Sequence, residues 1–445
     1  MSTPHELRRR LAHGLRLGAA GVVAAGEGRA AVGGARPLVA AKVLGETALL
    51  CRVAGRLLAD DPALARLEGL GAAQARLGDA VTRALDPQHA ALVVAADPHA
   101  YVREVFPFAL LGDLDTGHRS VARHLLDLVA DDDLGDEPDT FDRLERAWLR
   151  GLTDGGATAP PLPAGSVLHR GADLLHGELT DAYGLTHAVL HASDCGLASV
   201  RTARPAPAVA DDAEALLGAA LAVGNLDVAA ELLWTWPMLG VPLGAGARHG
   251  LAELARAEAT HGFLPGPEHE PIVAAGLAPA DRSTYVIQTS YHTAVVGGIL
   301  AAALLRTGRP VPPGRGVPHG RPTRRDAAAS ARPTTATSPG PVAGADPLPL
   351  LVLADGHWAD ALRAAPPARR AACAPLVLGA ELRTAAARHD PARVHHLVAW
   401  AADHGWSHLP SVRQGATLLT RVVRAAAEPT VSAARGARRR SGPAA

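Results

Sequence analysis

The chain has 445 residues, and its 44 lysine and arginine residues balance 44 aspartate and glutamate residues, so the formal net charge is zero. A balanced charge excludes the strong basic excess that marks proteins of nucleic acids or anionic membrane surfaces. The length allows two or three domains with a substantial core. Lys42 is the only lysine, and the apolar residues are mostly Ala, Leu and Val, as in proteins from GC-rich bacterial genomes.

Cysteine usage and hydropathy indicate where the protein works. The three cysteines are far apart and lack metal-binding spacing: Cys51, Cys195 and Cys373. An odd number of widely spaced cysteines favours a reducing compartment over a disulfide framework. Residues 17–25 are too weakly apolar for the core of a signal peptide. The best apolar run, 294–305, covers about half of the roughly 20 residues that a spanning helix needs. We therefore expect a cytoplasmic protein without a membrane span.

Composition also predicts the order of segments along the chain. Helix-forming Ala, Leu and Arg dominate, and the β-branched alternation typical of strands is scarce. Gly and Pro break this pattern at 151–165, which joins two halves of one assembly or separates two domains. The predicted segments are helical regions at 1–150 and 160–306, a disordered linker at 307–346, a small helical domain at 347–430 and a disordered tail at 431–445.

Two segments have the pattern of a helical hairpin. In 214–240, one helix is expected to end near Val223 and the next to run from the Gly224-Asn225 turn to about Trp236. A similar layout recurs at 380–403. Repeated hairpins predict stacked helix pairs, so we expect an all-α protein built as an α-solenoid or a closed α/α-toroid.

The strongest functional pattern lies between Leu168 and Gly196. Eight polar residues there follow one another at spacings of three or four, and would share one stripe of a single helix: His169, Asp173, His176, Thr180, Tyr183, His187, His191 and Asp194. A solvent-facing stripe would carry Arg, Lys or Glu. Short His, Tyr, Thr and Asp side chains are instead suited to lining a polar cavity.

Within this stripe, His187, His191 and Asp194 are candidate metal ligands. Two histidines and one carboxylate suit zinc or non-haem iron, with positions left open for water or substrate. Residues seven apart lie roughly 10 Å apart along a helix axis, so two of the three with a ligand from another segment make a better site. Two alternatives stay open: a substrate pocket without metal, and a structural seam in which each imidazole is hydrogen-bonded.

Tyr291-His292 is the best candidate partner from elsewhere in the chain. It is expected just ahead of an apolar helix at 293–305, whose paired Gly297-Gly298 permits close helix contact. A histidine in the first turn of a helix tends to stay neutral, which suits a ligand or a base. The alternative is a capping or core histidine.

Other motifs carry less weight. Asp132-Asp133-x-x-Asp136 has the letter pattern of the Mg²⁺–diphosphate motif of isoprenoid synthases, but it includes Gly135 and precedes a proline, as an exposed turn would. The chain contains no GxGxxG, P-loop, GxSxG, HExxH or CxxC pattern, so the common nucleotide, serine-hydrolase and zinc-protease chemistries lose support. The basic linker and tail lack interleaved aromatics, which argues against a nucleic-acid partner.

The segments Y-x-L-T-H at 183–187, D-x-G at 194–196 and Y-H-T at 291–293 resemble those of a family of uncharacterised helical proteins from actinobacteria. The resemblance covers 160–305, with Cys195 where a bulkier apolar residue is expected. It implies that these residues belong to one site. Members of that family look like accessories to natural-product pathways.

These observations lead to three functional hypotheses. The first is a tailoring or maturation enzyme of a specialised-metabolite pathway, acting on a small molecule or peptide. In it, His187, His191 and Asp194 bind a metal or act as acid and base, and Tyr183 and His292 complete the pocket. The second is a non-catalytic helical-repeat scaffold that binds a protein or peptide. The third and weaker one is prenyl-diphosphate chemistry at Asp132–Asp136.

Overall fold

The computed structural model describes residues 3–129, 140–154, 162, 165–176, 179–200, 202, 204–307, 346–352 and 356–427. Every regular element in these ranges is a helix, which confirms the predicted all-α class. The acidic run at 130–139 and the tail at 431–445 lie outside the described residues. So does the predicted linker, apart from the residues at its two ends.

The N-terminal region contains the following helices: α1 (Pro4–Gly26), α2 (Ala40–Asp60), α3 (Pro62–Arg66), α4 (Leu70–Ala84), α5 (Pro87–Ala96), α6 (Tyr101–Glu104), α7 (Phe106–Leu111), α8 (Thr116–Asp127) and α9 (Thr140–Thr153), with short 3₁₀ turns at Leu67–Gly69 and Pro98–Ala100. α1 begins with a capping box, in which the Thr3 hydroxyl accepts from the Glu6 N–H and the Glu6 carboxylate accepts from the Thr3 N–H.

The central and C-terminal regions continue the helical pattern: α10 (Val167–Arg170), α11 (Leu179–Ala192), α12 (Ala206–Ala222), α13 (Leu226–Leu239), α14 (Ala245–His261), α15 (Pro271–Gly276), α16 (Pro279–Arg306), α18 (His357–Arg363), α19 (Pro367–Ala372), α20 (Ala374–Ala387), α21 (Pro391–Asp403) and α22 (Pro410–Ala427), with a 3₁₀ turn at Leu348–Leu350. Both predicted hairpins are present, as α12–α13 and α20–α21. α13 continues through Pro237 to Leu239, two residues beyond the proline that was expected to end it.

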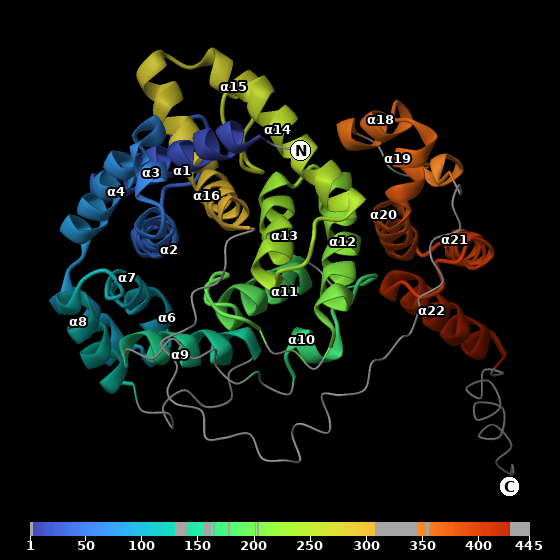
Figure 1. Cartoon of the computed structure of the whole chain (residues 1–445), viewed down its shortest axis with the longest axis horizontal. Helices are drawn as coiled ribbons and strands as arrows, with labels where there is room; N and C mark the ends of the chain where they lie inside the picture. The colour runs from blue at the N-terminus through green and yellow to red at the C-terminus, as the bar shows by residue number, and fades with distance from the viewer. Residues whose placement is uncertain are drawn as a thin grey trace, which may run out of the picture.

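The longest helix, α16, lies in the interior between the N-terminal helices and the central hairpin (Figure 1). It packs along α1 and also contacts α2 and α13. From Thr284 to Ala303, every residue is buried except Val286 and His292. Among the described residues, α16 alone is long and apolar enough to cross a membrane, and 89% of its most apolar window is buried inside the molecule. This burial is typical of the core helix of a folded protein.

Glycines set the closest approach of α1 to α16. A Cβ atom on Gly14 would lie 2.6 Å from the carbonyl oxygen of Ala294 and 3.1 Å from the Cα of Gly298. The two backbones are therefore in direct contact, and Gly298 allows the close packing that the paired glycines predicted.

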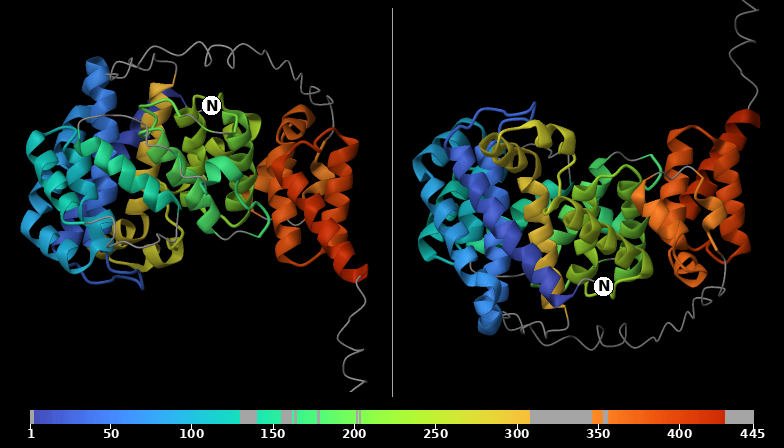
Figure 2. Two further views of the ribbon diagram at one scale, coloured as in Figure 1. Left: turned by 90° about the horizontal axis from the view of Figure 1, so that it is seen from below. Right: turned by 90° about the horizontal axis from the view of Figure 1, so that it is seen from above.

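The C-terminal helices dock through a second crossing of this kind, between α12 and α20. A Cβ on Gly218 would lie 2.3 Å from the Leu376 carbonyl oxygen, and one on Gly379 would lie 2.5 Å from the Ala215 Cα. Buried side chains of α20 and α21 belong to the same hydrophobic core cluster as those of the N-terminal helices. In Figure 2 these helices form one end of an elongated molecule.

We expect G14A to lower the free energy of unfolding by about 1–3 kcal/mol, because the new methyl group meets backbone atoms that cannot turn aside. Urea denaturation followed by circular dichroism measures this change. G26A is the matched control on the same helix, since nothing lies within 4 Å of its added Cβ. Helix propensity should leave G26A as stable as the wild type or more stable by up to about 1 kcal/mol. Equal stability of the two variants would contradict a tight crossing.

Candidate functional site

The polar stripe expected on one helix is divided among three segments. α10 ends at Arg170, and Gly171 has a φ of 85°, in the region that favours glycine. Asp173 then forms a turn by accepting from the N–H groups of Leu175 and His176. Thr180, Tyr183, His187 and His191 lie on α11, and the other four do not, so the prediction of a single helix carrying the whole stripe was wrong.

Asp194 follows the end of α11, and its side chain pairs with Arg52 instead of joining His187 and His191. Its backbone φ is 49° and that of Cys195 is 58°. Both carboxylate oxygens lie within 3.0 Å of Nη2 of Arg52, whose side chain is 1% exposed. Trp148 Nε1 donates a 2.8 Å hydrogen bond to the same carboxylate. Asp194 therefore compensates a buried guanidinium group.

His191 belongs to this structural network as well. Its ring stacks on Trp148 at 5.0 Å between centroids, and burial holds its pKa well below the usual value, so the ring is neutral. The His187 and His191 rings lie 6.0 Å apart, edge to face. The structure thus corrects the first ligand assignment: it does not gather His187, His191 and Asp194 around one ion.

His292 lies deep within α16 and not in the first turn of a helix. The helix begins at Pro279, about three and a half turns earlier, so the positive helix pole does not act on this imidazole. The polar residues of 279–290 obscured the true helix start in the sequence. The expected neutral histidine is therefore corrected too, because carboxylates on both sides of the ring decide its charge.

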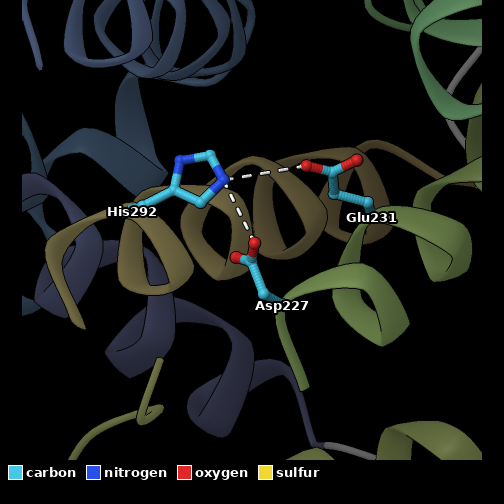
Figure 3. Close-up of side chains that lie close together, drawn as sticks. All are labelled: Asp227, Glu231 and His292. Atoms are coloured by element: carbon cyan, nitrogen blue, oxygen red, sulfur yellow. Dashed lines mark ion pairs between the residues drawn. The ribbon is translucent and has the colours of Figure 1, made fainter. Parts of the chain in front are cut away.

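Four helices, counting α16 itself, contribute polar groups to the surroundings of the His292 ring. Nδ1 lies 2.9 Å from Oε2 of Glu46 on α2, and Nε2 lies 3.2 Å from Oδ2 of Asp227 on α13. Oε1 of Glu231, one turn further along α13, is 3.8 Å from Nε2. Figure 3 shows the two α13 carboxylates converging on the same side of the imidazole. In the part of the chain that the structure describes, Asp227, Glu231 and His292 are the group whose potential metal-ligand atoms all lie within 4.8 Å of one another.

The fourth helix, α11, supports this cluster from the other side. The Thr186 hydroxyl donates a 2.8 Å hydrogen bond to Oε2 of Glu231. His187 Nδ1 lies 2.9 Å from the Tyr183 carbonyl oxygen, so this nitrogen carries the proton and donates it. The Tyr183 and His187 rings meet edge to face at 6.0 Å. Two of the predicted site residues, Tyr183 and His187, thus border the cluster.

Burial and charge push the pKa values of the cluster apart. Burial opposes ionisation of Asp227, but the neighbouring imidazole outweighs it and lowers its pKa. Burial and then the charge of Asp227 raise the pKa of Glu231 to about 8. Burial opposes protonation of His292, yet Glu46 and Asp227 raise its pKa well above the usual value. Carboxyl groups one turn apart therefore favour opposite protonation states, the arrangement of an acid beside a base.

The same environment acts on the bordering residues. Burial raises the pKa of the Tyr183 phenol, and the carboxylates of the cluster add to the increase. Burial lowers the pKa of His187, with a further lowering from the charge of His292. Both side chains thus lie within electrostatic reach of the cluster.

Solvent reaches one side of the cluster. The side chain of His292 is 26% exposed and that of Glu46 is 21% exposed, whereas Asp227 and Glu231 are 5% and 3% exposed. Lys42, which is half exposed, lies 3.6 Å from Glu46 at the rim. The buried carboxylates thus form the floor of a site with a partly accessible histidine above them.

Sequence reasoning missed Glu46, Asp227 and Glu231. A usable signal was present, because Asp227 and Glu231 are spaced i, i+4 within the otherwise apolar segment LDVAAELLWTW. Carboxylates that share the face of a helix flanked by apolar residues face the core. Glu46 is similarly enclosed in an apolar helix.

Residues 27–302, more than half of the chain, match the DUF6895 family, which is described as a domain of unknown function. The chain belongs to the DUF6895 family. The matched region contains every residue of the cluster, and the DUF6895 match ends before α18–α22 begin. No curated protein and no solved structure matches the chain.

The structural role of Asp194 gives a direct test. We expect D194N to lower the free energy of unfolding by about 3 kcal/mol, because the Arg52 guanidinium stays buried with less compensating charge. Urea denaturation measures the change. D360N is the control, since Asp360 pairs with Arg363 on an exposed helix face and its loss should matter by less than about 0.5 kcal/mol. An unchanged stability of D194N would argue that Asp194 has a role other than charge compensation.

Proposed function

We propose that this DUF6895 chain is an enzyme that modifies a small molecule or a peptide, with Glu46, Asp227, Glu231 and His292 as its reactive centre. The observation that carries the proposal is the convergence of three carboxylates and a histidine from three helices at a point that solvent reaches. Clusters of titratable groups with strongly perturbed pKa values are a feature of active sites.

The energetics of burial support an active site over a purely structural seam. Burying a carboxylate is unfavourable unless an opposite charge and hydrogen bonds compensate it. Asp194 has such compensation from Arg52. The cluster has three acidic groups, and the cations paired with it are the single imidazole and the half-exposed Lys42. Apolar packing would be more stable than these buried ionisable groups, so their presence is better explained by chemistry.

The bordering residues extend the proposed site. Tyr183 and His187 lie on the side from which α11 faces the cluster, where they can contact a bound substrate. His191 and Asp194 have no part in this proposal. The free, buried thiols of the three cysteines support a cytoplasmic location. A role in tailoring or maturation within a specialised-metabolite pathway remains part of the proposal.

The other two hypotheses have less support. A scaffold would need a continuous apolar surface for its partner, whereas the most exposed large apolar residues belong to separate elements: Leu92 on α5, Val223 after α12 and Ile272 on α15. The Asp132–Asp136 motif required for prenyl-diphosphate chemistry lies outside the described residues.

Gene complementation tests the enzyme proposal without knowledge of the substrate. The gene is deleted in its native strain and restored as wild type or as E231Q, and extracts are compared by liquid chromatography and mass spectrometry. We expect that E231Q will not restore the wild-type metabolite profile, because it removes a reactive group with little change in volume.

The matched control is E253Q. Glu253 is a buried glutamate on α14 that pairs with Arg256, away from the cluster. E253Q should restore the wild-type profile at equal protein level by immunoblot. Restoration of the profile by E231Q would contradict an enzymatic role for the cluster and favour the scaffold.

A further inference from the structure

The geometry around His292 has the dimensions of a metal-binding site. Metal–ligand bonds of about 2.1 Å that meet at octahedral or tetrahedral angles place neighbouring ligand atoms roughly 3.0–3.4 Å apart. The distance from His292 Nε2 to Asp227 Oδ2 is 3.2 Å, and that to Glu231 Oε1 is 3.8 Å. One distance lies inside this range, and a small rotation of the Glu231 side chain would bring the other into it.

The groups around these three residues match the support that metal ligands usually have. A metal-bound histidine commonly donates its other ring N–H to a carboxylate, which fixes the ring orientation. Glu46 lies 2.9 Å from Nδ1 of His292, on the side of the ring opposite Asp227 and Glu231. The Thr186 hydroxyl orients the second oxygen of Glu231 with its 2.8 Å hydrogen bond.

An unsatisfied buried atom points to a ligand as well. Oδ1 of Asp227 has no hydrogen-bond partner, although the side chain is 5% exposed; the other oxygen, Oδ2, is the one directed at the imidazole (Figure 3). A buried carboxylate oxygen without a partner is costly and calls for an explanation. A cation held between Asp227, Glu231 and His292 would supply the missing interaction if Asp227 bound it through both oxygens.

We infer that Asp227, Glu231 and His292 bind a divalent transition-metal ion of the zinc class, with Glu46 and Thr186 as the groups that orient its ligands. This inference deepens the proposed function, because it places the ion at the proposed reactive centre. Three protein ligands leave at least one coordination position open in a tetrahedral site, as in catalytic zinc sites. The His292 side chain is 26% exposed, so the site is not closed to solvent.

Zn²⁺ binding tests the inference directly. The full chain is stripped of metal with a chelator and titrated with Zn²⁺ by isothermal titration calorimetry, with the bound metal counted by elemental analysis. We expect about one equivalent in the wild type. We expect the D227N/E231Q double variant to bind Zn²⁺ more than about 100-fold more weakly, because two of the three ligands are lost.

Two further variants separate metal binding from folding. E253Q should bind as the wild type does, since Glu253 lies outside the cluster. E46Q should weaken Zn²⁺ binding by about 10–100-fold, the usual effect of losing a group that orients a ligand. Glu46 is more exposed than Asp227 and Glu231, so E46Q is expected to fold. It therefore tests the inference even if circular dichroism shows that the double variant is unfolded. With Co²⁺ in place of Zn²⁺, the visible absorption bands should change in H292N.

Several results would overturn the inference. These are a folded wild type that binds no Zn²⁺, and binding that neither D227N/E231Q nor E46Q weakens. The complementation experiment judges the proposed function separately. If E231Q fails to restore the metabolite profile and the wild type binds no Zn²⁺, the protein is an enzyme with a metal-free centre. Zn²⁺ binding together with restoration of the metabolite by E231Q would leave a metal site without catalysis.

Discussion

Compensation of buried acidic charge is the constraint on which the rest of this structure depends. Two of the places where the protein buries carboxylates compensate them in different ways. Around Asp194, two guanidinium groups (Arg52 and Arg56) and an indole N–H meet two carboxylates, Asp194 and Asp113, so the charges are matched. Around His292, three acidic groups meet one imidazole and solvent has access. The first arrangement holds helices together. The second leaves a buried carboxylate oxygen, Oδ1 of Asp227, without a hydrogen-bond partner.

Close helix packing makes the second arrangement geometrically feasible. His292 is one residue among many on α16, and the register of that helix is set where its backbone touches α1 at Gly14. The same helix contacts α2 and α13, which supply the carboxylates. Because backbone contact tolerates little sliding, the imidazole is held between groups from helices that are far apart in the sequence.

The sequence was sufficient for the fold class and for the hairpins, because both depend on local composition, periodicity and turn residues. It identified Tyr183, His187 and His292 as polar residues near one another, and the structure places all three at the cluster. It misplaced Asp194, whose partner Arg52 is distant in the sequence and could not be paired with it by spacing. It also missed Glu231: the i, i+4 spacing from Asp227 indicates that both face the core, but only tertiary packing shows that they face His292.

The docking of α20 on α12 has a consequence for the cluster around His292. α12 and α13 form one hairpin, joined by the short turn at Gly224-Asn225, and α13 carries both buried carboxylates. α12 therefore packs against the C-terminal helices, while α13 supplies the two buried carboxylates of the cluster. The two glycine contacts bring the backbones of α12 and α20 into direct contact, so the two helices have little room to shift against each other. The α12–α13 hairpin thus connects helices that lie outside the family match with the carboxylates of the cluster, which lie inside it.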